Sequence, residues 1–420
     1  MADVRVGPAS DPERYLNTDL LVWFDEPPVA TTEQLLAGFG ENSMFGAEVD
    51  GADERTYAGV YGVYPLELTV PGPLGTLRQV PVAGLTWVGV HPDERRRGVL
   101  TAMLRDHFSR VGDGDWSGLS VLKASEPAIY GRHGYGVASW ECTLRLSRGA
   151  RLTAPGLEDA ASALRTRLTD AADPGVPARM REVSLRVGAD RLGAVVREER
   201  LYTRFTVDSP ASVREREVQR VLLAQQDGTD VGFAWFRRKL DWENGSAAGE
   251  VGVIELVGTP AAELALLRRL VDLDLTTSVT IRWRSVDDPI AAWAGGPRGI
   301  QDATSDSLWV RLVDLPTALG ARGYAAQCDV VLEVEDAACP ANHGRWRLVV
   351  DAQGRGTANR TDATPDVRLT TQTLASAYLG ARSLVAQQQA GLLTEVTDGS
   401  VAALDTAMRA AQVPVAAVGF

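Results

Sequence analysis

The chain is short of lysine. Of its 43 basic residues only Lys123 and Lys239 are lysines. Codon bias in a GC-rich genome is the simplest explanation of such a shift toward arginine. An enzyme that modifies amines and keeps few of its own is a second interpretation, which the composition alone does not favour.

Cysteine is scarce as well. Cys142, Cys328 and Cys339 are odd in number, far apart, and in no spacing typical of metal ligands. This argues against a disulfide framework and against a zinc site. We therefore expect no bound metal and a reducing, cytoplasmic location.

Long apolar runs and an excess of positive charge are also missing. No stretch of about 20 apolar residues occurs, and the start, MADVRVGPASDPERYL, lacks the basic and apolar regions of a signal peptide. Lys and Arg number 43 against 55 Asp and Glu, a formal charge of -12. We expect neither membrane nor nucleic-acid partners, whereas cationic partners would be attracted.

What is present is typical of a large globular protein. The 420 residues are 45% hydrophobic and 23% charged. Such a length can bury more than one core, and at the usual domain size it predicts about three domains.

The first third alternates between strand and helix patterns. Apolar runs at 66–70, 80–90 and 119–122 predict strands, and apolar residues at helical spacing predict a helix over 98–111. This order indicates an α/β domain. After Arg148 the stretch GARLTAPG is a candidate boundary, beyond which a new series begins with apolar runs at 185–187 and 201–207.

An internal repeat supports a second domain of the same kind. LTWVGVHPDERRRGVLTAMLRDHF and VIELVGTPAAELALLRRLVDL both pass from a strand through a proline into a helix, and a strand follows each. The first copy has Arg95, Arg96, Arg97 and Gly98 before its helix, and the second copy does not. Duplication with one silent copy explains this pattern, although a generic strand-proline-helix pattern can also arise by chance.

The last third has a different character. DVVLEVED and RWRLVVD, joined through CPANHG, predict a hairpin, and LTTQTLASAYLG and VAALDTAMRAA predict two amphipathic helices. The α+β unit ends in the apolar VPVAAVGF, which we expect to be docked because an exposed end would be polar.

The segment from Val88 to Leu100 carries the first chemical signal. A strand leads into a helix that starts at Gly98, with three arginines before it. Unpaired N–H groups and the helix dipole favour an anion such as a pyrophosphate there, and glycine permits close approach. Three cations at a helix start oppose the dipole, so a ligand is favoured over a solvated basic face.

These residues resemble a known family. Arg95-x-x-Gly98-x-Leu100 is similar to the acyl-CoA signature of GNAT acetyltransferases, with Leu100 in place of the last small residue. The longer stretch ASEPAIYGRHGYG, residues 124–136, resembles the segment that carries the catalytic tyrosine in the Eis family of GNAT proteins. LWVRLVDLP and ARGY, at 308–316 and 321–324, resemble that family's entry into its last domain.

The resemblance implies a fold of α/β and α+β type with three domains. Residues 1–150 would form a GNAT acetyltransferase domain with the CoA site, and residues 151–304 a second GNAT-like domain without the CoA signature. Residues 305–420 would form a domain like sterol carrier protein. The family also implies a homohexamer, although no interface can be inferred from these residues.

The resemblance further implies roles for single residues. The backbone of Val88, Gly89 and Val90 would contact the pantetheine arm and thioester of acetyl-CoA. The residues that would hold its pyrophosphate are Arg96, Arg97, Gly98, Val99, Leu100 and Thr101. Ser125 and Glu126 would flank the cofactor. Tyr130 corresponds to the general acid, and Phe420 to the terminal residue whose α-carboxylate is the base. An amine pocket would be lined by Trp23, Phe24, Asp25, Glu26 and Trp87.

The implied chemistry is consistent. An alkylamine, with a pKa of about 10.4, must lose a proton before it attacks a thioester. An α-carboxylate is a weak base, with a pKa of about 3.5 in water, and burial by the apolar tail would have to raise that pKa. N–H groups near Val88–Val90 could stabilise the oxyanion while Tyr130 protonates the departing sulfur.

Several residues keep a second interpretation. Tyr130 could be a core tyrosine, Asp25 and Glu26 could be exposed loop acids, and His133 is an alternative base that we expect to be exposed. Tyr135 is assigned to packing and Cys142 to a buried strand.

The leading hypothesis is an N-acetyltransferase that uses acetyl-CoA to modify primary amines of a small cationic acceptor. The resemblance adds aminoglycosides, other amine drugs and lysine side chains as candidate acceptors. A lipid or sterol carrier, and a CoA-sensing interaction protein without turnover, are the alternatives.

Overall fold

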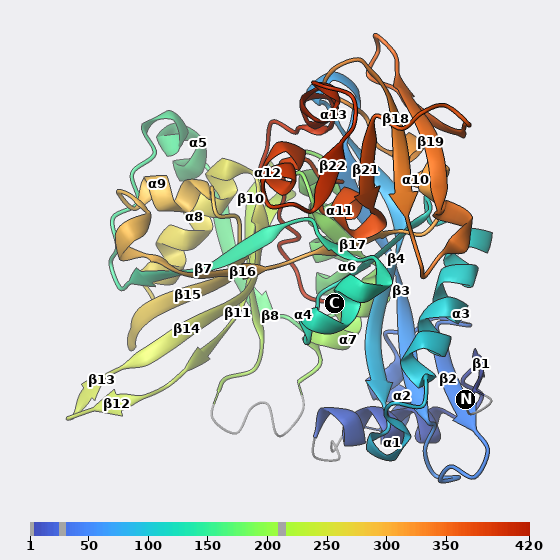
Figure 1. The fold of residues 1–420 in the computed structure, drawn as a ribbon. Helices are drawn as coiled ribbons and strands as arrows, with labels where there is room; N and C mark the ends of the chain where they lie inside the picture. The colour runs from blue at the N-terminus through green and yellow to red at the C-terminus, as the bar shows by residue number, and fades with distance from the viewer. Residues whose placement is uncertain (1–3, 25–30, 209–215) are drawn as a thin grey trace. The chain divides into compact units, whose positions relative to one another are not determined.

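The computed structural model describes residues 4–24, 31–208 and 216–420 (Figure 1). They form two compact units. One holds residues 1–139, 307–414 and 420, and the other holds residues 140–306 and 415–419. Among the described residues, no helix combines the length and the apolar character that crossing a membrane would need.

The first unit begins with a mixed sheet. Its strands, in spatial order, are β1 (Val4–Pro8), β2 (Met44–Val49), β3 (Gly59–Pro71), β4 (Leu77–Val90), β5 (Leu119–Leu122), β17 (Trp309–Leu312) and β6 (Gly136–Val137). Its helices are α1 (Pro12–Trp23), α2 (Thr32–Leu36), α3 (Val99–Asp113) and α4 (Pro127–Tyr130). The strands predicted at 66–70, 80–90 and 119–122 and the helix predicted at 98–111 are confirmed.

Helix α3 covers this sheet because its apolar residues recur at helical spacing. Val99, Met103, Leu104 and Phe108 are buried along one face and belong to the core that includes Tyr61 and Leu122. β4 and β5 are paired in parallel, and α3 connects them in the chain, as in a strand-helix-strand unit.

The same unit contains the last domain. Its sheet has the order β20 (Gly356–Arg360), β19 (Gly344–Val350), β18 (Cys328–Glu335), β21 (Val367–Thr370) and β22 (Leu393–Glu395). Helices α10 (Leu315–Ala321) and α13 (Ser400–Met408) pack on β20 and β18, and α11 (Thr371–Ser376) and α12 (Leu384–Gln389) pack on β21 and β22 (Figure 1). The predicted hairpin and both predicted helices are confirmed.

The second unit is built on another mixed sheet. Its order is β16 (Gln301–Asp306), β7 (Trp140–Ser147), β15 (Thr276–Arg284), β14 (Gly249–Gly258), β11 (Thr229–Lys239), β10 (Arg220–Gln226) and β8 (Arg165–Asp170). Its other elements are α5 (Glu158–Ser162), α6 (Val176–Gly188), β9 (Val195–Arg197), α7 (Glu199–Thr206), the small β12 (Trp242–Glu243) and β13 (Ser246–Ala247) pair, α8 (Pro260–Val271) and α9 (Pro289–Trp293).

The runs at 185–187 and 201–207 belong to helices. Residues 185–187 lie in α6, where Met180 and Val183 face the core, and residues 201–206 lie in α7. Short apolar runs cannot distinguish a strand from one face of a helix. The sequence left the type of these two elements open, and the structure shows both as helices.

Two strands join sheets that their chain position does not suggest. β7 follows the first domain in sequence but pairs with β15 and β16, and β17 follows the second domain but pairs with β5 and β6. Sequence patterns give strand positions but not partners, so this exchange was not predicted.

Candidate active site

The end of β4 is shaped by a bulge. Val60 of β3 pairs with Gly89, but Gly62 pairs with Thr86, so β4 has one extra residue between these two pairs. Within this bulge Trp87 has a positive φ of 51°. Pairing of β4 with β5 runs from Ala83 to Gly84, so it ends well before β4 does. The stretch that contains Val88, Gly89 and Val90 therefore diverges from β5, which leaves room for an extended chain beside it.

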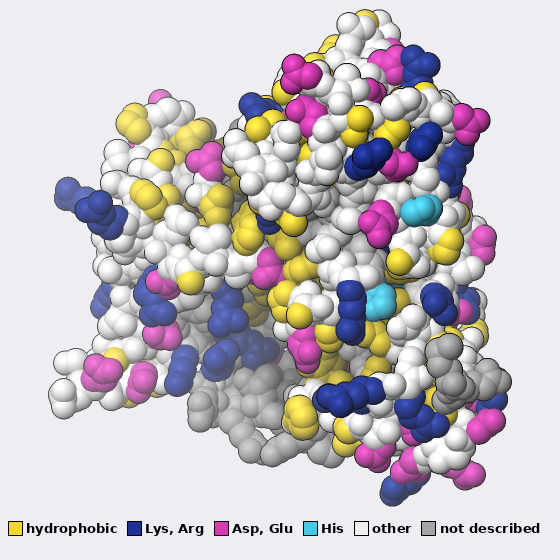
Figure 2. Space-filling model, in the orientation of Figure 1, with side chains coloured by type: hydrophobic (Ala, Val, Ile, Leu, Met, Phe, Trp, Pro, Cys, Tyr) yellow, Lys and Arg dark blue, Asp and Glu magenta, His cyan; other side chains and the backbone are white. Residues whose placement is uncertain are grey.

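The start of α3 is open and basic. Arg95, Arg96, Arg97 and Gly98 are all exposed, and basic side chains gather near this end of α3 in Figure 2. Gly98 has a φ of 89°, and nothing lies within 4 Å of the position its Cβ would take. No side chain caps the helix, and its first turn has no acidic residue. First-turn N–H groups have no partner within the helix and require one from outside it.

A diphosphate fits this helix start. Its charge would be stabilised by the dipole and by the arginines, of which Arg97 also pairs with Glu94. Val99 is buried, and Leu100 packs partly against the same core, so these two can contribute backbone groups but not side chains. Thr101 is exposed at the helix start, where it was expected to hold the pyrophosphate, and Ser125 and Glu126 are exposed, as a flanking role requires.

Tyr130 ends the short helix α4 and lies against the domain core. Its ring meets that of Tyr135 edge to face, with centroids 5.8 Å apart. Burial, and to a lesser extent the charge of Glu126, raises the pKa of Tyr130 to about 12. Its hydroxyl therefore keeps its proton at neutral pH, which a general acid needs.

Tyr135 is a packing residue, as predicted. It is fully buried, and its hydroxyl shares a 2.7 Å hydrogen bond with Ser120, which is also 2.7 Å from His107 Nε2. Cys142 is confirmed as a buried strand residue in β7, and burial raises its pKa to about 11.

The expectation that His133 is exposed is wrong. Its side chain is buried, with 9% exposed, in the turn after α4, and this turn packs against α11. Burial lowers its pKa, and Arg132, Arg311 and Arg105 lower it further. At this position the imidazole is therefore a weaker base than an exposed histidine would be.

The aromatic residues expected in an amine pocket are placed differently from one another. Trp87 is partly buried against Tyr15 and Phe39, with ring centroids 6.1 and 5.2 Å away. Trp23 and Phe24 are exposed at the end of α1. Asp25 and Glu26 lie outside the described residues.

Helix α1 brings its end close to the end of β4. A Cβ placed on Gly89 would lie 3.1 Å from Val22, the neighbour of Trp23. The exposed aromatic residues therefore follow a segment that contacts the expected thioester strand. Sequence reasoning missed this contact, because nothing in the pattern of α1 names its partner.

The apolar tail is docked, as predicted. Residues 415–418 are buried, and Val415 N–H and Ala416 C=O bond to Leu192 and Val195. Arg197, which pairs with buried Glu255, donates to the Gly419 carbonyl at 3.2 Å. Phe420, one residue on, groups with the unit that contains Tyr130. Sequence reasoning missed Arg197, since a lone arginine after a short strand carries no signal.

Three segments of the chain match known domain families. Residues 3–138 and 193–312 each match an acetyltransferase (GNAT) domain, and residues 315–417 match a sterol carrier protein domain. The expected order of two acetyltransferase domains and a sterol-carrier-like domain is confirmed.

Whole-length relatives are acetyltransferases. The chain is 39% identical over 373 residues to an uncharacterized N-acetyltransferase of Streptomyces avermitilis, with 88% of each chain covered. It is 30% identical over 358 residues to N-acetyltransferase Eis of Mycobacterium tuberculosis, with 83% of this chain and 82% of that one covered. The crystal structure of Eis1 from Mycobacterium abscessus has a TM-score of 0.79 at 29% identity, and both chains are covered in full.

Proposed function

This chain belongs to the Eis family of GNAT N-acetyltransferases, and we propose that it acetylates primary amines of a small cationic acceptor that carries several of them. The enzyme class is acetyltransferase, and acetyl-CoA is the donor that GNAT enzymes use. The acceptor class is supported by the acidic composition, which attracts cations, and by the exposed Trp23 and Phe24 near the end of β4. Aminoglycosides, other amine drugs and lysine side chains are the candidate acceptors.

The observation that carries the proposal is the open start of α3. An uncapped helix, a glycine with free space and exposed arginines offer the donors that the pyrophosphate of acetyl-CoA requires. Arg96, Arg97 and the backbone from Gly98 to Thr101 would hold it. The pantetheine arm would bind along Val88–Val90, the part of β4 that diverges from β5.

Acetyl-CoA supplies an activated acetyl group as a thioester. The N–H groups of the diverging strand stabilise the negative charge that develops on the thioester oxygen. Tyr130 donates its proton to the departing sulfur, and its pKa of about 12 keeps that proton in place until then. The α-carboxylate of Phe420 receives the first proton, which the ammonium must lose before the nitrogen attacks. The second proton, which the nitrogen loses as the amide forms, restores the Tyr130 hydroxyl after that group has protonated the sulfur.

The position of the proposed base depends on the tail. Arg197 and Glu255 form a buried pair, and Arg197 holds Gly419, the residue before Phe420. A short anchored tail limits where the carboxylate can go, which favours a fixed catalytic role over a free chain end.

Steady-state kinetics with acetyl-CoA and an aminoglycoside test the two catalytic roles. Tyr130→Phe should lower kcat at least about 100-fold with little change in acetyl-CoA KM. Tyr378→Phe removes a fully buried tyrosine hydroxyl, which donates to the Ala318 carbonyl in the last domain, and should keep kcat. A Tyr130→Phe variant as active as the native enzyme would exclude Tyr130 as the acid.

Moving the carboxylate tests the base. A chain extended by a few residues beyond Phe420 should lose most activity, whereas Phe420→Ala retains an α-carboxylate at that position and should lose less. Normal turnover by the extended chain would exclude the carboxylate, and a water chain or His133 would take its place.

The hexamer, the cytoplasmic location and the absence of membrane, nucleic-acid and metal partners stay predictions. Light scattering would test the hexamer.

A further inference from the structure

The segment after Tyr130 is backed by the last domain. After α4 the chain makes a tight turn, Gly131–His133, and enters β6 at Gly136. A Cβ on Gly136 would lie 2.4 Å from both the Gln372 carbonyl oxygen and the Ser376 nitrogen, and a Cβ on Gly131 would lie 2.7 Å from Gln372 Nε2. The backbone of this segment therefore touches α11 so closely that only glycine fits at position 136.

Arg311 lies behind the same turn. It is fully buried in β17, and Gly134, with a φ of 83°, is so close that a Cβ would lie 2.8 Å from its guanidinium carbon. Arg311 donates to both carboxylate oxygens of Asp336, each at 2.7 Å, and to the Leu312 carbonyl at 2.9 Å. A cation that contacts the turn is thus held by an acid from the last domain.

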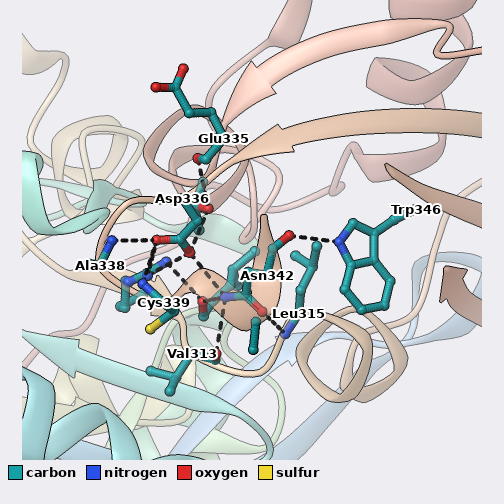
Figure 3. A network of polar contacts seen from close by, with 12 residues as sticks. Val313, Leu315, Glu335, Asp336, Ala338, Cys339, Asn342 and Trp346 are labelled. Carbon is teal, nitrogen blue, oxygen red and sulfur yellow. Dashed lines mark hydrogen bonds and ion pairs between the residues drawn. The ribbon is translucent and has the colours of Figure 1, made fainter. Parts of the chain in front are cut away.

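Asp336 is the centre of a polar network between β17 and the last domain (Figure 3). Its carboxylate accepts hydrogen bonds from Arg311, from Asn342 Nδ2 at 3.1 Å and from Thr371 Oγ1 at 2.9 Å. The N–H groups of Ala338 and Cys339 donate to it as well, at 3.1 and 2.9 Å. Thr371 is the first residue of α11 and Arg311 belongs to β17. The Asp336 carboxylate therefore binds both elements that contact the segment after Tyr130.

The opposite side of the turn is fixed by the acetyltransferase domain. Tyr135 N–H donates to the Tyr130 carbonyl at 3.3 Å, and the Tyr135 hydroxyl is held by Ser120. The turn that follows Tyr130 is therefore held on both sides, by α11 and Arg311 on one and by Tyr135 and Ser120 on the other.

We propose that Asp336 is a positioning residue for Tyr130, acting through Arg311 and through Thr371 at the start of α11. The last domain thereby serves catalysis by holding the general acid in line with the leaving sulfur. This inference rests on the proposed role of Tyr130. Its energetic basis is that displacement of a reacting group by about 1 Å costs roughly 100-fold in rate.

The test is the kinetics of Asp336→Asn against a matched control. Asp405 is also a buried acid of the last domain, equally exposed at 6%, and it pairs with Arg409 and with the N–H of Leu384. Asp336→Asn should lower kcat about 10-fold or more while acetyl-CoA KM stays within about 2-fold. Asp405→Asn should lower thermal stability and leave kcat unchanged. Equal loss of kcat in both variants, or an unchanged kcat in folded Asp336→Asn, would overturn the proposal.

A double-mutant cycle separates positioning from general damage. If Asp336 acts through Tyr130, adding Asp336→Asn to Tyr130→Phe should lower kcat much less than it does in the native chain. Fully multiplicative losses would overturn the proposal. Where Asp336→Asn does not fold, Thr371→Val removes one hydrogen bond without stranding a charge, and the same cycle applies. Failure of the proposed function is visible separately, as an active Tyr130→Phe single variant.

Discussion

The two acetyltransferase domains share a strand-helix-strand unit and differ at the start of its helix. In the first domain the unit is β4, α3 and β5, and in the second it is β14, α8 and β15. Both leading strands carry a register shift, and both diverge from the following parallel strand, after Gly84 in one and after Val253 in the other. The same backbone features, a bulge and an early end of the parallel pairing, therefore occur beside both helix starts.

In the second domain the space beside the helix start is filled by the chain itself. Thr259 caps α8 by accepting from Ala262 N–H, and Glu263 in the first turn is fully buried. Arg284 of β15 donates to Glu263 and Asp288, each at 2.7 Å, and to the Leu256 carbonyl of the diverging β14 at 2.9 Å.

The two helix starts differ in the residues that surround them. α3 starts at a glycine with no side-chain cap and with exposed arginines before it, whereas α8 starts with a threonine cap and carries the buried pair of Glu263 and Arg284. A buried carboxylate in the first turn disfavours a second anion, such as a pyrophosphate, at the same helix start.

Removal of Arg284 should have the largest effect on this comparison. Arg284→Met leaves Glu263 and Asp288 buried without their shared partner, and loss of one member of a buried pair costs about 3–5 kcal/mol. We expect the free energy of unfolding, measured by urea titration, to fall by that amount. Arg186→Met removes the exposed pair with Glu182 and should cost less than about 0.5 kcal/mol. Equal effects would mean that Arg284 does not stabilise the two buried acids.

Acid should destabilise the first domain, because its helix α3 contains the buried His107. Burial, opposed by the charge of Asp106 and assisted by that of Arg110, lowers the pKa of His107 to about 3. The unfolded chain takes up a proton below its ordinary pKa of about 6.5, so the neutral buried form stabilises the fold above that pH. This contribution is lost as the pH falls from 6.5 toward 3, by about 1.4 kcal/mol per unit.

The measurement is the free energy of unfolding at pH 7 and at pH 5. His107→Gln retains a partner for Ser120 and should reduce the loss between these pH values by about 2 kcal/mol. His343→Gln, at an exposed position, is the matched control. A native pH dependence in His107→Gln would assign the acid sensitivity to other groups.

A carboxylate transplanted to α3 should make it resemble α8. Ala102 N–H donates to the Gly98 carbonyl as Glu263 N–H donates to that of Thr259, so the two residues occupy the same helix position. Ala102→Glu should raise acetyl-CoA KM about 10-fold, since an acid in the first turn competes with the pyrophosphate for the helix start. Ala102→Gln has the same size without the charge and should stay near the native value; an equal rise would indicate a steric cause.

The sequence predicted one side of this comparison better than the other. Arginines and a glycine before α3 stand together in the chain, so the open helix start and the Tyr130 segment could be recognised. Closure of the second site depends on Arg284 and Glu263, which are far apart in sequence and meet through the parallel pairing of β14 and β15. The contacts of Arg311 with Asp336 likewise require β17 to return to the first sheet. Spacing carries no information on such partners.

The smallest effect expected is that of the α8 cap. Thr259→Ala removes the side-chain acceptor of Ala262 N–H, and loss of such a cap costs about 1 kcal/mol, whereas Thr259→Ser retains the acceptor and should cost less. Urea unfolding measures both. Acetyl-CoA KM should be the same in the two variants, because the start of α8 is satisfied internally and has no role in holding the donor. A rise in KM confined to Thr259→Ala would mean that the second helix start contributes to acetyl-CoA binding, and the distinction between an open and a filled site would fail.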